Sequence, residues 1–258
     1  MTPTLPVKKI AKPELTQGEQ TYRQLRSMIV NCELHPGSTV SEPELTFLLG
    51  KGKAAVRAAL LRLAHDGFVF AVPRHGYRVA PLEVKDAIDL TQLRLLTEPL
   101  AYRLATGRID PAAIESAIKL YVAGYDAKNP KSVTRFMTKN REFKIEIARA
   151  SGNDRLAAWV EEVSERIDRY LRVSSSLFDL SPVMEENALP LCLALRDGDA
   201  KEAERLAEKN IYAITAKILS SLFHNGLAET VGAPIFAFNE EAVVAMLGRT
   251  RETPKNTE

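Results

Sequence analysis

The sequence predicts a mainly α-helical protein with an N-terminal winged helix-turn-helix domain followed by an all-α bundle of six or seven helices. Its 258 residues exceed one average domain and are enough for two. Three helical patterns precede two short strand-like segments in residues 16–82, and from residue 83 onward nearly every segment has helical spacing of its apolar residues. We therefore expect one domain on each side of a boundary near residue 82.

The composition is that of an ordinary folded protein, because 45% of the residues are hydrophobic and 26% are charged. The apolar runs are far shorter than the roughly 20 residues that a membrane-spanning helix needs. Residues 1–14 lack the apolar core of a secretory signal. Cys32 and Cys192 provide neither a disulfide framework nor a metal-binding spacing. We expect a cytoplasmic protein without a membrane partner.

Charge is distributed unevenly, although the net charge is only +2. Residues 1–80 carry 11 Lys and Arg against 6 Asp and Glu, whereas residues 81–258 carry 24 against 27. A basic N-terminal part beside a mildly acidic remainder favours nucleic acid as the partner of the first domain. Ordinary fluctuation of charge along the chain is the alternative explanation.

The first elements are an arm and two helices. Residues 1–15, with three prolines and three lysines, predict a flexible arm. A helix is expected from Gln17 to about Asn31, where apolar residues recur at intervals of three and four. Ser41, with Glu44 three residues later, forms the capping box of a short second helix.

A third helix and a hairpin complete the predicted N-terminal domain. The helix runs from about Lys53 to Asp66 and is stopped by Gly67. Two strands, Phe68–Val72 and Tyr77–Ala80, flank a Pro-Arg-His-Gly turn. This order of elements predicts a helix-turn-helix with a β-hairpin wing.

A winged helix-turn-helix predicts that the third helix enters the major groove of DNA. Lys53 and Arg57 are one turn apart, and Arg57 lies about 90° from the centre of the apolar stripe, so it can face outward. Alanines at the start of the helix let the backbone approach DNA closely. Residues at the tip of the hairpin are placed to contact phosphates or the minor groove. The candidate DNA-binding residues are Lys51, Lys53, Ala54, Ala55, Arg57, Arg74, His75 and Gly76. For each charged residue alone, a solvated surface side chain is the alternative.

The second domain is predicted over residues 83–224, and residues 225–258 are expected to form a tail with a possible short helix at Glu240–Leu247. Gly152, Pro182 and the Asp197-Gly198-Asp199 turn separate several of the helical segments. The expected helices are 83–105, 111–125, 130–150, 153–178, 183–197 and 199–223. Six helices without a convincing strand predict an all-α bundle.

Four of these helices place amide or charged residues on their apolar faces. The six residues are Arg94, Glu98, Asn140, Lys144, Asn187 and Asn210. One buried polar residue is usually satisfied within the core or lies at an interface, but polar residues on four helices favour a lined cavity. The sequence therefore predicts a binding site inside the bundle.

Residues 19–82 resemble the DNA-binding domain of GntR-type bacterial regulators without a gap. The matching motifs are Leu25-Arg-x-x-Ile29, Pro36-Gly37, Ser41-Glu42, Val56-Arg-x-Ala-Leu60, Leu63-x-x-Asp-Gly67 and the wing glycine Gly76. The family usually opens its recognition helix with Ser/Thr-Arg-Thr/Ser, whereas this chain has Gly52-Lys53-Ala54-Ala55, and Pro43 replaces a common arginine. Lys53 keeps the charge but lacks the bidentate fork of arginine, which suits guanine.

The helical part resembles the FCD-type effector domain of the FadR subfamily, in its six-helix form. The resemblance rests on Leu93-Arg-x-x-x-Glu98, on Asn140-x-x-Phe143 with Ser151-Gly-Asn153, and on the segment from Asn187 to Asn210. It implies a homodimer that binds a pseudo-palindromic operator in double-stranded DNA and responds to a small molecule, most often as a repressor that a metabolite releases.

Many such domains hold a divalent metal through an Asp or Asn and three histidines. The matching positions here read Asn140, Lys144, Asn187 and Asn210, so every histidine is replaced. Without imidazole, thiolate or carboxylate, a zinc or nickel site is not credible. We expect no metal and no other cofactor.

Lys144 suggests what replaces the metal. A buried ammonium is costly unless it is paired, and a small anionic metabolite would pair it. The asparagines would supply directional donors and acceptors, and Arg94 could clamp a carboxylate. The alternative is that Lys144 pairs with Glu98 and leaves a degenerate pocket without a ligand. The hypothesis requires Lys144 to lie inside the bundle.

The chain is not expected to be an enzyme, because it has no Ser/His/Asp set, no glycine-rich phosphate loop and no metal triad. The predicted function is a DNA-binding transcription regulator. The alternative is an oligomeric helical interaction protein with degenerate DNA-binding and effector sites.

Overall fold

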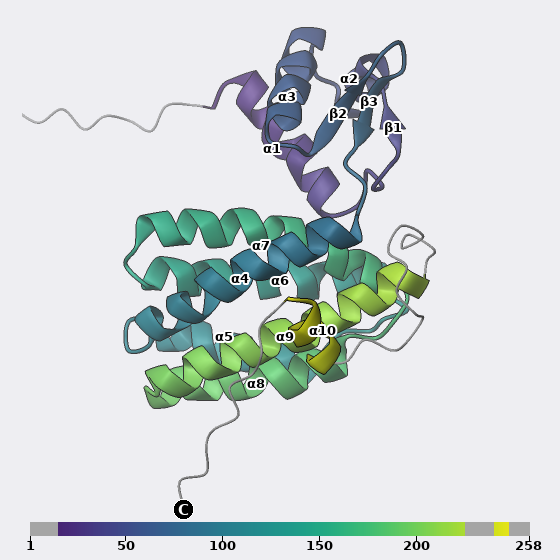
Figure 1. The fold of residues 1–258 in the computed structure, drawn as a ribbon. Coiled ribbons are helices and arrows are strands. Elements are labelled where there is room, and N and C mark those ends of the chain that lie inside the picture. Colours follow the sequence, from purple (N-terminus) through teal and green to yellow (C-terminus); the bar gives the residue numbers. More distant parts are fainter. Residues whose placement is uncertain (1–14, 225–239, 248–258) are drawn as a thin grey trace, which may run out of the picture. The chain divides into compact units, whose positions relative to one another are not determined.

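A computed structural model describes residues 15–224 and 240–247 of the chain (Figure 1). Residues 1–14 of the predicted flexible arm and most of the predicted tail lie outside these residues. The described chain divides into two compact units. The first contains the chain up to Ile29 and Gly37–Ala80, and the second contains Val30–Pro36 and the chain from Pro81 onward.

The first unit is a winged helix-turn-helix. Its elements are α1 (Gln17–Val30), β1 (Thr39–Val40), α2 (Glu42–Leu49), α3 (Lys53–His65), β2 (Val69–Val72) and β3 (Gly76–Val79). The strands form an antiparallel sheet in the order β1-β3-β2. Apolar side chains fill the core, and those at most 1% exposed include Leu25, Leu45, Val56, Leu60, Leu63 and Phe68.

Local sequence signals explain the turn between the two short helices. The Ser41 hydroxyl accepts a hydrogen bond from the Glu44 backbone, and the Glu44 carboxylate accepts one from the Ser41 backbone, as the capping box predicts. Gly50 ends α2 in the left-handed region at φ 61°. Strand β1 was not expected, because two residues are too short to show an alternating pattern. It forms because Thr39 and Val40 pair with Arg78 and Tyr77 of β3.

The second unit is a helical bundle, which confirms the predicted fold class. Its helices are α4 (Val84–Ala105), α5 (Pro111–Ala123), α6 (Pro130–Ala150), α7 (Asp154–Ser175), α8 (Ser181–Asp197), α9 (Ala200–His224) and α10 (Glu240–Met246). Helix α4 lies between α9 and α7, α8 packs on α9 and α5, and α6 packs on α7 (Figure 1). Helix α10 packs on α9.

Three helix boundaries in the bundle differ from the sequence prediction by two residues or more. Helix α7 ends at Ser175, three residues before the predicted end at residue 178. Helix α5 ends at Ala123, two residues early, because Gly124 turns the chain at φ 57°. Helix α8 begins at Ser181 and so includes Pro182 in its first turn. Proline is tolerated there because the N–H groups of the first turn have no partner within the helix, so the missing N–H removes no helical hydrogen bond.

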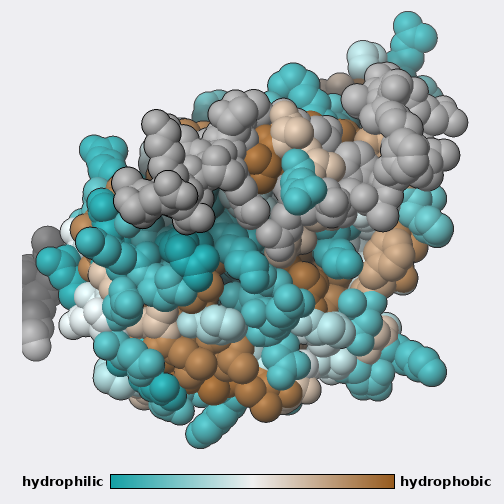
Figure 2. Space-filling model, turned by 60° about the horizontal axis from the view of Figure 1, so that its bottom comes forward, coloured by the Kyte–Doolittle hydropathy of each residue, from teal (hydrophilic) through white to brown (hydrophobic). Residues whose placement is uncertain are grey.

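One face of the chain shows how polar and apolar side chains are distributed on the surface. Figure 2 shows one face of the chain on which hydrophilic side chains predominate and hydrophobic residues form smaller groups. Among the described helices, none is both long and apolar enough to cross a membrane.

Gly76 provides a test of the wing geometry. Its φ is 86°, and a Cβ at this position would lie 2.6 Å from the carbonyl oxygen of Val40. We expect Gly76→Ala to lower the free energy of unfolding of the first unit by about 1–3 kcal/mol from backbone strain, and by more if the strands must separate. Chemical denaturation followed by circular dichroism measures this loss.

Gly50→Ala is the matched control, because Gly50 also has a positive φ of 61° but no atom within 4 Å of the added Cβ. It should lose less stability than Gly76→Ala. Equal losses for the two variants would contradict the close approach of β1 to β3.

Candidate DNA-binding surface and buried polar site

Helix α3 carries four of the eight predicted DNA-binding residues, Lys53, Ala54, Ala55 and Arg57. Val56, Ala59, Leu60 and Leu63 are at most 1% exposed and anchor the helix to the core. Lys53, Ala54 and Arg57 are exposed, and Ala55 and the preceding Lys51 are partly buried. The Gly52 N-cap provides no side-chain hydrogen bond. The start of α3 therefore presents two cations and free backbone N–H groups to solvent.

Arg57 is only weakly engaged within the chain. Its side chain is 71% exposed, and its Nε lies 3.9 Å from a carboxylate oxygen of Glu42. An exposed ion pair of this length contributes little to stability. The guanidinium is consequently available to a phosphate or a base edge.

The wing turn directs its polar residues to solvent. Arg74 has a positive φ of 67°, and the His75 N–H donates to the Val72 carbonyl oxygen, which closes the turn. Arg74 and His75 are exposed, whereas Gly76 is partly buried against Val40. Gly76 thus shapes the turn, while Arg74 and His75 are free to contact a ligand.

The six predicted effector-site residues are all buried in the bundle. Their exposed fractions are 0% for Arg94, 3% for Glu98, 4% for Asn140, 7% for Lys144, 4% for Asn187 and 6% for Asn210. They come from α4, α6, α8 and α9. Lys144 therefore lies inside the bundle, as the anion-site hypothesis requires.

Arg94 and Glu98 form a bidentate ion pair within α4. Nε of Arg94 donates to Oε1 of Glu98 at 2.6 Å, and Nη2 donates to Oε2 at 3.3 Å. Burial raises the pKa of Glu98, but the charges of Arg94 and Lys144 outweigh this effect and leave the pKa below its usual value. Nη1 of Arg94 is buried without a hydrogen-bond partner.

The Lys144 ammonium has no close partner. No hydrogen bond or ion pair within 4.0 Å links it to another residue in the described part of the chain. Burial lowers its pKa, and the more distant charge of Glu98 only partly offsets that effect. Because Arg94 occupies both Glu98 oxygens, the expected alternative, a Lys144–Glu98 pair, is not formed at contact distance.

The asparagines are only partly satisfied. Oδ1 of Asn140 accepts from the Tyr121 hydroxyl at 2.8 Å, and Nδ2 of Asn187 donates to the Val183 carbonyl oxygen at 2.9 Å. Oδ1 of Asn187 and Oδ1 of Asn210 are buried without a partner. Buried polar atoms without a partner are rare and costly.

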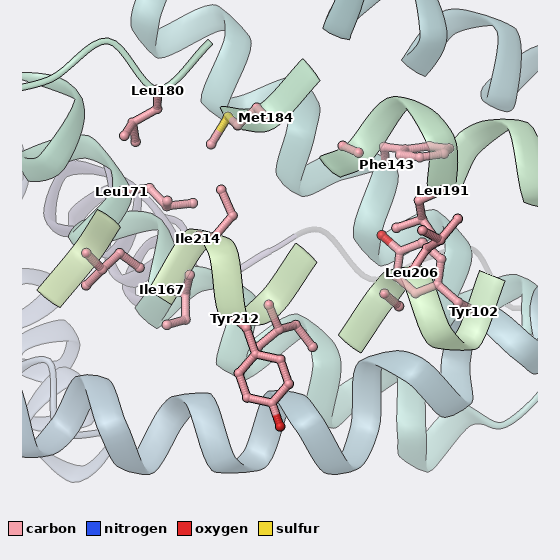
Figure 3. Close-up of a cluster of buried hydrophobic side chains, with 14 of the residues drawn as sticks. Tyr102, Phe143, Ile167, Leu171, Leu180, Met184, Leu191, Leu206, Tyr212 and Ile214 are labelled. Atoms are coloured by element: carbon pink, nitrogen blue, oxygen red, sulfur yellow. The ribbon is translucent and has the colours of Figure 1, made fainter. Parts of the chain in front are cut away.

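Figure 3 shows apolar side chains of the bundle core, with Leu206 and Ile214 of α9 among them. These two residues belong to one buried cluster, and Asn210 is halfway between them in the sequence. On α8, Asn187 lies between Met184 and Leu191 at the i, i+3, i+7 spacing of one helical face. The asparagines therefore lie on helix faces whose neighbouring residues belong to the apolar core.

A second set of buried charges was not predicted. Asp168 of α7 is 2% exposed and accepts from Arg141 at 2.8 Å, with Arg172 at 3.7 Å. Burial raises the pKa of Asp168 to about 6, despite both arginines and the charge of Lys144. Asp168 and Arg172 fall on the buried face of α7, which is the signal that sequence reasoning could have used, and Arg141 reaches Asp168 from α6.

The residues at the position of the family's metal do not fit a metal. Three carboxamides and an ammonium provide none of the strong zinc or nickel ligands. Across the described residues, no group of three or more His, Cys, Asp or Glu is arranged to hold an ion.

A surface hollow of about 700 Å³ lies between α5 and α6. Its walls include Ser116, Lys119, Arg135 and Lys139, and the buried rings of Phe136 and Phe143. None of the six polar residues lines it. The enclosed cavity expected around these six residues remains a prediction.

The chain matches two family models. Residues 17–79 match "Bacterial regulatory proteins, gntR family", and residues 89–213 match the FCD domain. The first match covers the winged unit and the second begins in α4 and ends in α9.

Similar proteins agree with these matches. The Nta operon transcriptional regulator of Aminobacter aminovorans is 29% identical over 140 residues, which span 54% of this chain and 66% of that protein. The HTH-type transcriptional repressor RspR of Escherichia coli K12 is 22% identical over 208 residues, covering 80% of this chain and 90% of that protein. The solved structure of E. coli McbR/YncC has the same fold, with a TM-score of 0.68 at 19% identity over 83% of this chain and 100% of that chain.

The matching families and relatives are regulators, which confirms the expectation of a regulator instead of an enzyme. The chain belongs to the GntR family of bacterial regulatory proteins, as a member that carries an FCD domain.

Proposed function

We propose that this protein is a cytoplasmic, dimeric transcription regulator whose winged unit binds an operator and whose helical unit binds a small anion without a metal. The exposed cationic face of α3 carries the DNA-binding part of the proposal. The buried, unpaired ammonium of Lys144 carries the anion-binding part. Repression is the proposed sign of regulation, supported by similarity to a protein named as a repressor.

In the proposed complex, α3 lies in the major groove and each wing reaches the neighbouring phosphates or minor groove. Two copies would then contact successive grooves of a pseudo-palindromic site. Lys53 and Arg57 would provide the main polar contacts from α3, while Lys51, Arg74 and His75 would neutralise phosphates. Ala54, Ala55 and Gly76 would permit close approach.

Arg57→Ala tests the DNA contact. We expect it to weaken binding to operator fragments, selected from a random pool by the wild-type protein, by about 1–3 kcal/mol, which is roughly 5- to 150-fold. Fluorescence anisotropy at several salt concentrations gives the affinity for operator and for random duplex.

Arg149→Ala is the control, because Arg149 is similarly exposed at 66% but lies on α6. It should bind as the wild type does. If the wild-type protein shows no preference for any sequence over random duplex, the oligomeric interaction protein becomes the better interpretation.

The proposed effector is a small organic or amino acid anion, or another anion of similar size. Its negative group would pair with Lys144 and with the free Nη1 of Arg94, and its polar groups would engage Oδ1 of Asn187 and Asn210. Asn140 and Glu98, already bonded to Tyr121 and Arg94, would hold the walls of the site. The positive charge of Lys144 would thus do what the metal does in related domains.

Lys144→Met tests the anion site. For organic acids that bind the wild-type protein in isothermal titration, we expect a loss of about 1.5–3 kcal/mol, roughly 10- to 150-fold in affinity. The unliganded variant should be at least as stable as the wild type, because methionine removes an unpaired buried charge at similar volume.

Lys139→Met is the matched control, since Lys139 lies on the same helix but is exposed and paired with Glu142. It should bind as the wild type does. Equal binding by Lys144→Met and wild type would exclude the proposed site, and absence of binding by any tested acid would favour the degenerate pocket. A stoichiometric transition metal in the purified protein would contradict the metal-free site.

Coupling between the sites is proposed to pass through α7 to the junction at Pro81–Glu83. The Tyr170 hydroxyl accepts from the Glu83 N–H at 3.2 Å and donates to Asp86 at 2.7 Å, so α7 holds the start of α4. The same turn contains Asp168, whose charge acts on Lys144. A ligand that binds one arrangement of this turn more tightly than another would change the affinity for DNA. The coupling free energy between two such sites is typically ~1–3 kcal/mol.

A second copy of the chain is proposed to bind the outer faces of α4 and α7. Leu96 on α4 is 62% exposed and Trp159 on α7 is 52% exposed, and these helices pack against each other. Exposed aromatic and aliphatic side chains on adjoining helices are typical of protein interfaces.

Trp159→Glu is expected to shift the protein from dimer to monomer at micromolar concentration, because a carboxylate replaces an interface anchor. Sedimentation velocity measures the change. Val122→Glu is the control, since Val122 is 59% exposed on α5, outside the proposed interface. A Trp159→Glu protein that remains dimeric would exclude this interface.

A further inference from the structure

The first nine residues of α3 expose few hydrogen-bonding side chains. Five residues in this stretch face solvent: Lys53, Ala54, Arg57, Ala58 and Leu61. Of these five, only Lys53 and Arg57 can donate a hydrogen bond. The other three end in methyl groups, and Leu61 is 58% exposed. The exposed Arg62 and His65 follow, and their side chains pair with Glu19 and Asp66.

The three apolar residues form one line along the helix. Ala54 and Ala58 are four residues apart, and Leu61 follows three residues later, so all three share a face. The core of the unit does not use this face, because Val56, Leu60 and Leu63 point to the opposite side. Fold stability therefore gives no reason for an exposed leucine here.

The major groove of DNA presents one apolar group that could meet this line. Thymine carries a 5-methyl group at the groove edge, and the other three bases present only donors and acceptors there. Alanine and other apolar side chains contact this methyl, whereas guanine is read by arginine or lysine.

We propose that α3 reads the thymine 5-methyl groups of its operator through Ala54, Ala58 and Leu61, between polar contacts from Lys53 and Arg57. This inference rests on the proposed placement of α3 in the major groove. The distance from Ala54 to Leu61 is about 10 Å along the helix, or roughly three base-pair steps. Each operator half-site should therefore contain thymines within a window of about four base pairs next to the positions read by Lys53 and Arg57.

The test replaces thymine by deoxyuridine, which removes only the methyl group and keeps every hydrogen-bonding atom. Operators are selected from a random pool with the full-length protein, and each thymine in the window is then replaced in turn. We expect about a fourfold loss of affinity for each contacted methyl, equivalent to about 0.8 kcal/mol. Thymines outside the window should tolerate the replacement without loss.

Protein variants assign each methyl to its side chain. Leu61→Ala and Ala54→Gly should each bring the ratio of thymine to deoxyuridine affinity close to one at a single position and leave it unchanged at the others. Because this ratio compares two DNAs with the same protein, any loss of folded protein cancels. Thr46→Ala, on α2, is a control that should not change the ratio at any position.

The outcomes separate this inference from the proposed function. If Arg57→Ala weakens operator binding but deoxyuridine binds as well as thymine throughout the window, methyl readout is overturned and the placement of α3 stands. The same conclusion follows if the selected half-sites contain no thymines in the window. If neither Arg57→Ala nor Lys53→Ala affects binding, α3 does not read DNA and both proposals fail.

Discussion

The burial of Lys144 in the helical unit is the constraint on which the interpretation of that unit depends. An ammonium removed from water loses several kcal/mol of hydration unless nearby groups replace it. The nearest acids are already committed, because Glu98 holds Arg94 in a bidentate pair and Asp168 accepts from Arg141. The bundle therefore encloses a positive charge, on Lys144, that neither of these acids pairs. A small anion is the simplest group that would balance this charge.

In the proposed function, an FCD domain would bind its effector without the ligands of the family's metal. A metal concentrates charge at a point and orients its ligands by coordination. Here Lys144 and Arg94 would supply positive charge, and the unpaired Oδ1 atoms of Asn187 and Asn210 would supply direction. A site built from charged and hydrogen-bonding side chains selects ligands by their shape and by the positions of their hydrogen-bonding groups. A metal site instead selects them by coordination number.

The winged unit depends on a different constraint, the close approach of backbone to backbone. Gly76 lets β3 lie against Val40, and this pairing holds β1 against the wing. The apolar stripe of α3 then sets which residues face outward. The core-facing residues of α3 and the outward Arg57 match the GntR pattern, whereas the outward Lys53 and Ala54 depart from it. The fold and the base readout are therefore separate properties of the same helix.

The sequence by itself determined the order of elements, most helix boundaries and the identity of the polar residues inside the bundle. These features follow from local rules: helical spacing of apolar residues, capping by Ser41 and Glu44, and stops at glycine. It also placed Arg57 on the outer face of α3, since the direction of a side chain on a helix follows from its position relative to the apolar stripe.

Only the tertiary structure decided which charges are paired. Arg94 and Glu98 are four residues apart on α4, and the sequence left open whether Lys144 would take Glu98 instead. The hydrogen bond from Tyr121 to Asn140, the cluster around Asp168 and strand β1 also depend on contacts between distant segments. Pairing depends on distances of a few ångströms between helices, and the spacing of residues along one helix does not contain that information.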